Sequence, residues 1–280
     1  MRKKGVGIIL IMIIASMALY LGITMVVSEI ASLIVLGFGV VTNVFYTLSI
    51  TSTAICIVFM LVWNLFLNRY FIDKSFTGER SNRDAARAVF LIAAAAVVSM
   101  ALNSVFNIVS YFYQDNVYTE LAESMASGTV FEIFLSTVIL APILEEIIFR
   151  GIFYAGFRNV FAFRMNEKKT VIFALIVSSA CFGIVHMNIS QFVYAFCLGL
   201  FLGYVYERTG KLYLSIVTHA ICNLISLIRM YLPVYETIST KVSYLAIDAA
   251  VLSAVAVVLL LLYRVIRGKS SQNQDQIPEA

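Results

Sequence analysis

The feature that most constrains this chain is a series of apolar stretches, each about 20 residues long. A helix of about 20 residues rises about 30 Å, which matches the hydrocarbon thickness of a bilayer. Hydrophobic residues make up 61% of the chain and charged residues only 13%, whereas soluble domains contain about 25% charged residues. The sequence therefore predicts an all-α, polytopic transmembrane helical bundle with no soluble domain of ordinary size between the spans.

Windows of this length predict about eight spans. The first begins near residue 7 and is expected to remain as an uncleaved span, because its apolar run exceeds the about 7–15 residues of a signal peptide. The Gly-containing stretch 37–49 is interpreted as a loop or re-entrant piece on the outer side, and whether 29–50 holds an additional span stays open. The other spans are expected at about 50–69, 88–110, 129–157, 170–188, 190–206, 212–231 and 243–265.

Basic residues cluster in alternate connections between the predicted spans, and this asymmetry sets the orientation of the helices. With a cytoplasmic N-terminus, 17 of the 20 Lys and Arg residues fall on the inner side, so both termini are expected in the cytoplasm. These residues lie in short loops without interleaved aromatic residues, so the lipid bilayer is an expected partner and nucleic acid is not. The four cysteines lie in apolar stretches without C-x-x-C spacing, which argues against a disulfide or zinc framework.

One predicted span contains the stretch APILEEIIFRG, residues 141 to 151, with three charges in an apolar setting. A charge at mid-bilayer costs at least about 2.5–3.5 kcal/mol. Glu146 and Arg150 share a helical face and can pair, whereas Glu145 lies about 100° away and can face a cavity. Pro142 lacks a backbone donor and can kink the helix. A structural ion pair explains Glu146 and Arg150 better than it explains a second, adjacent glutamate.

Two later spans hold the only histidines of the chain. His186 follows Phe182 by four residues, and Asn223 follows His219 by four residues, so the members of each pair share a helical face. A single buried histidine is more often a packing residue than a catalyst. Ionisable groups inside spans usually face the bundle interior and mark function, so two histidines, an amide and two carboxylates together predict one shared site.

These residue types suit the activation of water. A carboxylate acts as general base, and a neutral imidazole orients the water or accepts its proton. An asparagine amide and a second imidazole donate hydrogen bonds to a developing oxyanion. The alternative is a zinc ion, Zn2+, held by Glu145, His186 and His219 with water in the fourth position. Spacing does not choose between these schemes, and residue counting puts His219, Glu145 and His186 at different depths, about 12, 18 and 24 Å from the inner side.

Three motifs occur in order on separate late spans. They are E-E-x-x-x-R at 145–150, F-x-x-x-H at 182–186 and H-x-x-x-N at 219–223. Each motif alone has low specificity, but together, in this order and in a polytopic chain, they resemble the CPBP family, also called the Abi or CAAX prenyl protease 2-like family. The resemblance covers about 128–226, and the flanking spans are only generally similar.

The resemblance implies an intramembrane endopeptidase of the bacterial plasma membrane. It implies that Glu145 activates water with His186 as its partner, and that His219 and Asn223 stabilise the oxyanion. Members have been described both as metalloproteases and as glutamate-dependent enzymes without metal, so the resemblance leaves the zinc ion open. The substrates that it implies are membrane-associated peptides or proteins, with prenylated or leader-type sequences.

The resemblance also implies that Glu146 and Arg150 support the site as a pair. Gly199 and Gly203 form a small-x-x-x-small pattern, which we interpret as ordinary close packing of helices. The expected organisation is N-terminal transmembrane helices at 1–127, catalytic core helices at 128–230, and a last transmembrane helix with a polar tail at 231–280.

Two alternatives belong to other functional classes. A non-catalytic immunity or scaffold protein could have the same fold, since the presence of motifs does not prove turnover. A proton- or ion-coupled transporter could use the same Glu and His groups, but the order of the three motifs and the absence of an obvious inverted repeat disfavour it. The sequence leaves the oligomeric state open.

Overall fold

The structure, a computed structural model, describes residues 6–38, 44–70, 72, 82–113, 128–232 and 241–272, and every regular element in these ranges is a helix. Three long helices come first: α1 (Val6–Phe38), α2 (Val44–Tyr70) and α3 (Asn82–Tyr113). Five consecutive elements then form one rod: α5 (Val130–Ile133), the π-helix η2 (Phe134–Leu140), α6 (Ala141–Glu146), the π-helix η3 (Ile147–Tyr154) and α7 (Ala155–Ala162). The remaining helices are α8 (Glu167–Ile184), α9 (Ile189–Thr209), α10 (Leu212–Met230) and α12 (Val242–Gln272).

The all-α polytopic bundle predicted from the sequence is confirmed. Among the described residues, six helices are long and apolar enough to cross a membrane. They are α1, α2, α3, α9, α10 and α12. The rod and α8 are the two other helical units; the rod is interrupted by π-helices, and α8 begins with the charged residues Glu167, Lys168 and Lys169. The eight predicted segments therefore each correspond to a helix or to the rod, while the number that cross the bilayer stays a prediction.

The interpretation of 37–49 as a loop is wrong at both of its ends. Gly37 and Phe38 complete α1, and α2 already begins at Val44, because the stretch from 44 onward is apolar enough to extend the helix by several residues. Residues 39–43, 73–81 and 114–127 lie outside the described ranges, so much of the polar stretches 68–87 and 110–128 of the sequence is not described. At the other end of the chain, α12 continues to Gln272 and so takes in the start of the predicted polar tail.

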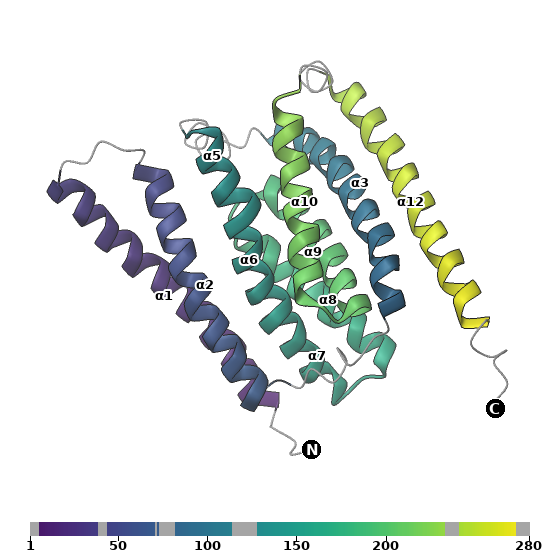
Figure 1. The fold of residues 1–280 in the computed structure, drawn as a ribbon, viewed down its shortest axis with the longest axis horizontal. Helices are drawn as coiled ribbons and strands as arrows, with labels where there is room; N and C mark the ends of the chain where they lie inside the picture. The colour runs from purple at the N-terminus through teal and green to yellow at the C-terminus, as the bar shows by residue number, and fades with distance from the viewer. Residues whose placement is uncertain are drawn as a thin grey trace.

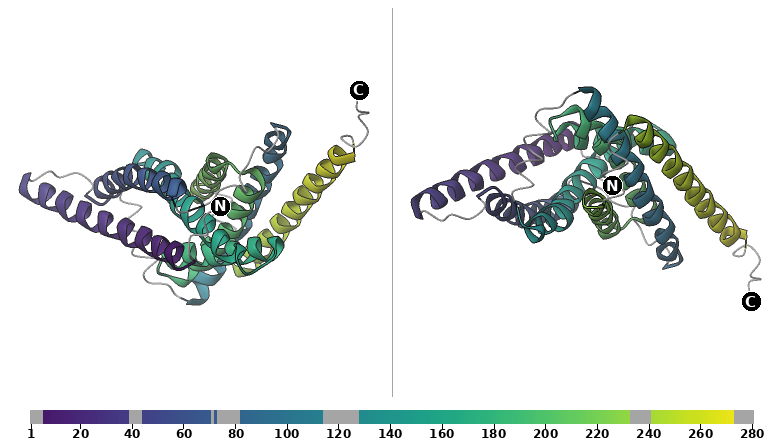
Figure 2. Two further views of the ribbon diagram at one scale, coloured as in Figure 1. Left: turned by 90° about the horizontal axis from the view of Figure 1, so that it is seen from below. Right: turned by 90° about the horizontal axis from the view of Figure 1, so that it is seen from above.

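The helices are arranged around the rod and α10. Figure 1 shows the pair α1 and α2 on one side of the rod, and α3 followed by α12 beyond α10. The helix α10 contacts η2 and α6 of the rod as well as α3 and α9, so it joins the two halves of the molecule. Viewed from above or below, α1 and α12 diverge from the central helices (Figure 2). The three motif-bearing elements therefore lie at the centre, flanked by more peripheral helices.

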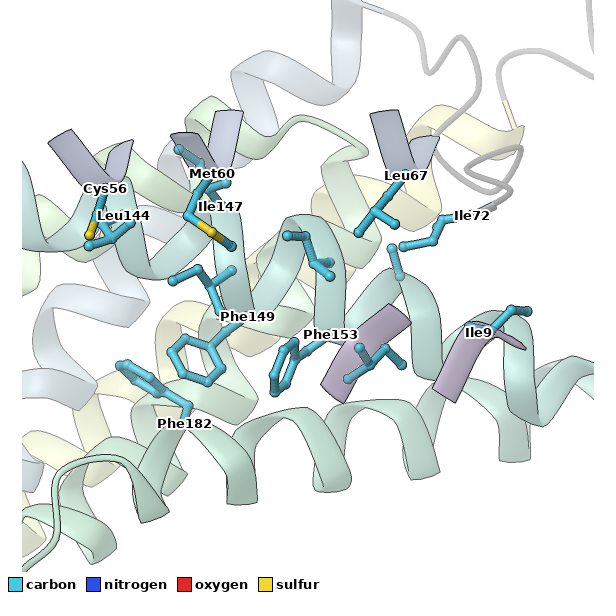
Figure 3. Packing of buried hydrophobic residues seen from close by; sticks show 14 of the residues in the cluster. Ile9, Cys56, Met60, Leu67, Ile72, Leu144, Ile147, Phe149, Phe153 and Phe182 are labelled. Carbon is cyan, nitrogen blue, oxygen red and sulfur yellow. The ribbon is translucent and has the colours of Figure 1, made fainter. Parts of the chain in front are cut away.

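The largest buried cluster forms where the rod meets α1, α2 and α8 (Figure 3). In Figure 3 the ring of Phe149 of η3 lies next to that of Phe182 of α8, with ring centroids 5.0 Å apart, and Phe149 forms a T-shaped pair with Phe153 at 5.4 Å. Met60 and Leu67 of α2, both fully buried, cover the opposite side of the rod. Every residue of η3 is buried, so this π-helix is held by side chains on several faces.

Two glycines allow α9 to approach α8 closely. A Cβ atom on Gly199 would lie 3.0 Å from the Cβ of Ser179 and 3.2 Å from the ring of Phe182. On Gly203 it would lie 2.6 Å from Cδ2 of Leu175, the far end of a flexible side chain. The interpretation of these glycines as helix-packing residues is therefore confirmed, with the tighter constraint at Gly199.

We expect Gly199→Ala to destabilise the protein more than Gly203→Ala does. The atoms facing Gly199 are fixed by their own backbone or ring, and overpacking of this kind costs about 1–3 kcal/mol. Leu175 can rotate away from residue 203, and both substitutions change helix propensity equally. Thermal unfolding in detergent or lipid would measure the difference. Equal midpoints for the two variants would contradict the packing described here.

Candidate active site

The structure joins four of the six predicted site residues, Glu145, Glu146, Arg150 and His219, by hydrogen bonds and ion-pair contacts between the rod and α10, and a fifth, Asn223, contacts the rod one turn further along α10. Glu145 and Glu146 end α6, Arg150 lies in η3, and His219 and Asn223 lie on α10. The sixth residue, His186, follows α8 and contacts this group through Phe182. The polar stripe on α10 faces the rod because its members recur every four residues along the helix.

Glu146 is the centre of this arrangement. Its side chain is completely buried and forms an ion pair with Arg150, with Oε1 and Nη1 2.8 Å apart. His219 Nδ1 lies 2.9 Å from the same Oε1, and the Ser215 hydroxyl donates to Oε2 at 2.6 Å. A buried carboxylate is tolerated only when it is paired and hydrogen-bonded. The predicted Glu146–Arg150 pair is thus present, and α10 supplies two further partners.

Arg150 is fixed on three sides. Besides the ion pair, its Nη2 donates to the main-chain carbonyl of Gly199 at 3.0 Å. Its guanidinium group also lies over the ring of Phe182, with 4.8 Å between Cζ and the ring centroid. The planar guanidinium suits this combination of hydrogen bonding and stacking, which an ammonium group would not reproduce. The close approach of α9 at Gly199 is therefore part of what holds the buried charge in place.

His219 lies between the two glutamates. Because the Glu146 carboxylate can only accept, the 2.9 Å contact assigns a hydrogen to His219 Nδ1. The other ring nitrogen, Nε2, lies 3.6 Å from Oε2 of Glu145. Glu145 differs from its neighbour in its surroundings, since 28% of its side chain is exposed. The residue in contact with Glu145 is thus His219, whereas the sequence resemblance pairs Glu145 with His186.

His186 is held at the end of α8 by its own main chain. Its Nδ1 lies 2.9 Å from the carbonyl oxygen of Phe182, which assigns the ring hydrogen to Nδ1 and leaves the lone pair of a neutral ring on Nε2. The turn that follows places Met187 at φ 58°, the left-handed region. Asn188 then caps α9 by accepting from the main-chain N–H of Gln191 at 2.7 Å.

The ring of Phe182 contacts both histidines. It makes edge-on contacts with His186 and with His219, with ring centroids 5.2 and 5.8 Å apart. In the described part of the chain, no hydrogen bond or ion pair joins His186 to Glu145. The predicted zinc ligands are therefore not gathered: no group of three His, Cys, Asp or Glu side chains in the described ranges could hold a metal ion.

Asn223 contacts the rod at its π-helical part. Its Nδ2 donates to the main-chain carbonyl of Thr137 at 2.8 Å. This contact lies one turn of α10 beyond His219. The sequence predicts an oxyanion donor at Asn223, and the amide has a second N–H that the Thr137 carbonyl does not use.

Sequence reasoning missed Ser215 and the contact roles of Gly199. Ser215 lies four residues before His219, so S-x-x-x-H-x-x-x-N extends the recognised motif by one helical turn. That spacing was a usable signal. The hydrogen bond from Arg150 to the Gly199 carbonyl could not be predicted in this way. Main-chain contacts between distant helices leave no pattern in a single sequence.

Two other buried charge groups lie away from the motifs. Arg229 of α10 pairs with Asp248 of α12 at 2.8 Å, and Arg229 also donates to the carbonyl of Met100 in α3 at 2.8 Å. Arg158 of α7 pairs with Glu207 of α9 at 3.0 Å. Each of these charges has a partner on another helix, so these groups tie helices together.

Comparison with known proteins gives matches over the segment that carries the three motifs. The family model for type II CAAX prenyl endopeptidases, Rce1-like, matches residues 127–225. The "Putative membrane peptidase YdiL" of Bacillus subtilis (strain 168) is 33% identical over 96 residues, which make up 34% of this chain and 36% of that protein. This matched segment, called the family segment below, is similar to the CPBP/CAAX protease family. No solved structure gives a significant match.

The family segment contains all six predicted site residues and Ser215. It spans the rod and helices α8, α9 and most of α10, which are the elements that form the polar interior described above. The match covers little more than a third of the curated relative. The long helices α1, α2, α3 and α12 lie outside the family segment.

We expect Arg150→Met to cost about 3–5 kcal/mol of stability, because it leaves the buried Glu146 carboxylate without its cation. Adding Glu146→Gln should recover part of that loss, since the amide removes the uncompensated charge. Unfolding midpoints of the two single variants and the double variant would measure this coupling. Strictly additive losses would contradict the buried pair.

Proposed function

We propose that this chain is an intramembrane endopeptidase in which Glu145 activates the attacking water. The observation that carries the proposal is the difference between two adjacent carboxylates. Glu146 is completely buried and has three partners, so both of its oxygens are occupied. Glu145 is partly exposed, and its nearest charged partner is the His219 imidazole at 3.6 Å. Glu145 is therefore the carboxylate that can accept a proton from water.

The proposed reaction is peptide hydrolysis by general acid–base catalysis. Glu145 removes a proton from water as the water oxygen forms a bond to the scissile carbonyl carbon. The carbonyl oxygen becomes an oxyanion in the tetrahedral intermediate. The proton held by Glu145 then passes to the amide nitrogen as the C–N bond breaks, which releases a carboxylic acid and an amine. The separation of 3.6 Å between Glu145 and His219 exceeds a hydrogen bond and would have to shorten for direct proton exchange.

His186 and His219 have distinct proposed roles. A neutral His186 has its lone pair on Nε2, so it can accept a hydrogen bond from the same water and orient it, as the family resemblance implies. His219 is oriented through Nδ1 by Glu146, which leaves Nε2 on the side of Glu145. We propose that the second N–H of Asn223 donates a hydrogen bond to the oxyanion. His219 can donate from Nε2 only as an imidazolium, because the single hydrogen of a neutral ring is on Nδ1, so we propose that it faces the oxyanion in its protonated form.

Zinc is the alternative way to activate the water. Bound zinc would act as a Lewis acid and would use Glu145, His186 and His219 as ligands. These three side chains would first have to come together, since no three-residue metal group exists among the described residues. The proposal that the carboxylate acts without metal is supported by the edge-on contacts of Phe182 with both imidazoles, since a phenyl ring that is no metal ligand occupies the space next to each of them.

The proposed substrates are membrane-associated peptides or proteins. A family named for CAAX prenyl endopeptidases favours a lipid-modified tail, while a leader peptide or the tail of a membrane protein is an alternative substrate class. Orientation is part of the proposal: the exposed Arg164, Lys168 and Lys169 at the α7–α8 turn support a cytoplasmic position for this turn and for both termini. We propose that the membrane is the bacterial plasma membrane.

We expect Glu145→Gln to lower cleavage by about 100- to 10,000-fold, the usual contribution of a general base. The fold should persist, because Glu145 is partly exposed and leaves the Glu146 partners unchanged. The test compares the membrane proteomes of native host cells carrying wild type or Glu145→Gln and identifies uncleaved precursors. Glu132→Gln is the matched control, because glutamine preserves the capping box at Thr129. Identical processing in all three strains would contradict the proposal.

We also expect cleavage to survive removal of metal. Purified protein would be treated with a chelator, analysed for zinc, and assayed with a precursor identified in the proteome comparison. Activity that persists in zinc-free protein supports water activation by the carboxylate alone. Stoichiometric zinc that is lost together with activity, and restored with it, would contradict the metal-free proposal and favour the zinc scheme.

A further inference from the structure

The π-helix η2 ends with one main-chain acceptor that lacks its expected donor. At this end the N–H of Ala141 donates to the carbonyl of Ser136, five residues earlier. The next bond of the same pattern would run from residue 142 to the carbonyl of Thr137. Residue 142 is a proline, which has no N–H. The helix therefore cannot supply this hydrogen bond itself.

Asn223 supplies a donor at this position. Its Nδ2 lies 2.8 Å from the Thr137 carbonyl oxygen. The Thr137 hydroxyl does not compete for this acceptor, because it donates to the carbonyl of Ile133 at 2.7 Å. A main-chain acceptor in a membrane interior has no bulk water to bind, so leaving it unpaired is costly.

We infer that Asn223, besides the oxyanion contact proposed for its second N–H, has a positioning role: its first N–H replaces the hydrogen bond removed by Pro142 and thereby fixes α6 against α10. The same face of α10 carries His219 and Ser215, which both bind Glu146 at the other end of α6. The rod is thus attached to α10 at two points, one on each side of α6. This attachment sets the position of Glu145, which lies between them in the chain.

The direction of the contacts fits this role. Along α10, Ser215 and His219 meet Glu146, and Asn223 meets Thr137, so increasing numbers on α10 meet decreasing numbers on the rod. This is the order that two antiparallel helices give. A shift of the rod along its axis would break contacts at both points together. For its effect on cleavage the inference rests on the proposed function, whereas its effect on helix packing does not.

A double-mutant cycle between Pro142 and Asn223 tests the inference. Asn223→Ala alone should lower the unfolding midpoint by at least about 2 °C, the size expected for one buried hydrogen-bond partner in a chain of this length. Pro142→Ala restores a main-chain N–H beside the Thr137 carbonyl. In that background Asn223→Ala should lower the midpoint by less than half as much. Equal shifts in both backgrounds would overturn the inference.

A matched asparagine serves as the control. Asn103 of α3 also donates its amide to a main-chain carbonyl, that of Ser99 at 3.0 Å, and to the Ser226 hydroxyl at 2.7 Å. Neither acceptor is connected with Pro142. Asn103→Ala should therefore lower the midpoint equally in the wild-type and the Pro142→Ala backgrounds. If Pro142→Ala weakened the Asn103 effect as well, its influence would be general and the inference would fail.

Two further readouts separate positioning from overall stability. Well below the midpoint, Asn223→Ala should speed amide hydrogen exchange in 137–146, and Pro142→Ala should reverse part of that increase; unchanged exchange would overturn the inference.

Cleavage of a precursor found with Glu145→Gln should also recover partly in the double variant. Cleavage equally low in Asn223→Ala and the double variant would mean that Asn223 acts at the oxyanion alone, which overturns the catalytic part. If the wild-type protein cleaves no precursor, the proposed function is refuted. The double-mutant cycle measured by unfolding midpoints then decides alone whether Asn223 positions the rod.

Discussion

The buried carboxylate of Glu146 is the interaction on which the rest of this interior depends. It lies inside a bundle where an unpaired charge would be costly, and it is stabilised by a cation and two hydrogen-bonding side chains from α10. Because Arg150 reaches onward to the Gly199 carbonyl, the same charge also connects the rod to α9. One carboxylate thereby fixes the mutual positions of the rod, α9 and α10.

The two adjacent glutamates have different roles in this arrangement. Both carboxylate oxygens of Glu146 already have partners, so the partly exposed Glu145 is the carboxylate that can contact a water or a substrate. Phe182 contributes to the surroundings of both the ion pair and the histidines, since its ring lies under the Arg150 guanidinium and contacts both imidazoles edge-on. Its side chain and main-chain carbonyl together fix the position and tautomer of His186. The site is therefore held by polar contacts on one side and by an aromatic ring on the other.

Much of the fold could be predicted from the sequence, because the length and polarity of lipid-facing helices leave few alternatives. The pairing of Glu146 with Arg150 also followed from helical spacing, since four residues separate them. Spacing within one helix says nothing about contacts between helices, however. For that reason the contact of Glu145 with His219, the hydrogen bond from Ser215 and the bond from Asn223 to Thr137 emerged only from the structure.

Counting residues placed His219, Glu145 and His186 at different depths for a related reason. Counting assumes that all spans begin at one level, whereas in Figure 1 α7 and the start of α8 reach below the α9–α10 turn. His219 is therefore near the beginning of its helix and still level with Glu145 and Glu146, which it contacts. The π-helices η2 and η3 were also not predicted, because π-helical turns are rare and have no sequence pattern of their own.

The most direct measurement is nitrogen NMR of the protein in lipid with its histidine rings labelled with 15N. The chain contains only two histidines, and a His186→Gln variant would assign the remaining signals to His219. The account predicts a hydrogen on Nδ1 of His219, with a signal that shifts when Glu146 is replaced by glutamine but keeps its tautomer when Glu145 is replaced. A neutral His219 with its hydrogen on Nε2, or a signal indifferent to Glu146, would contradict the account.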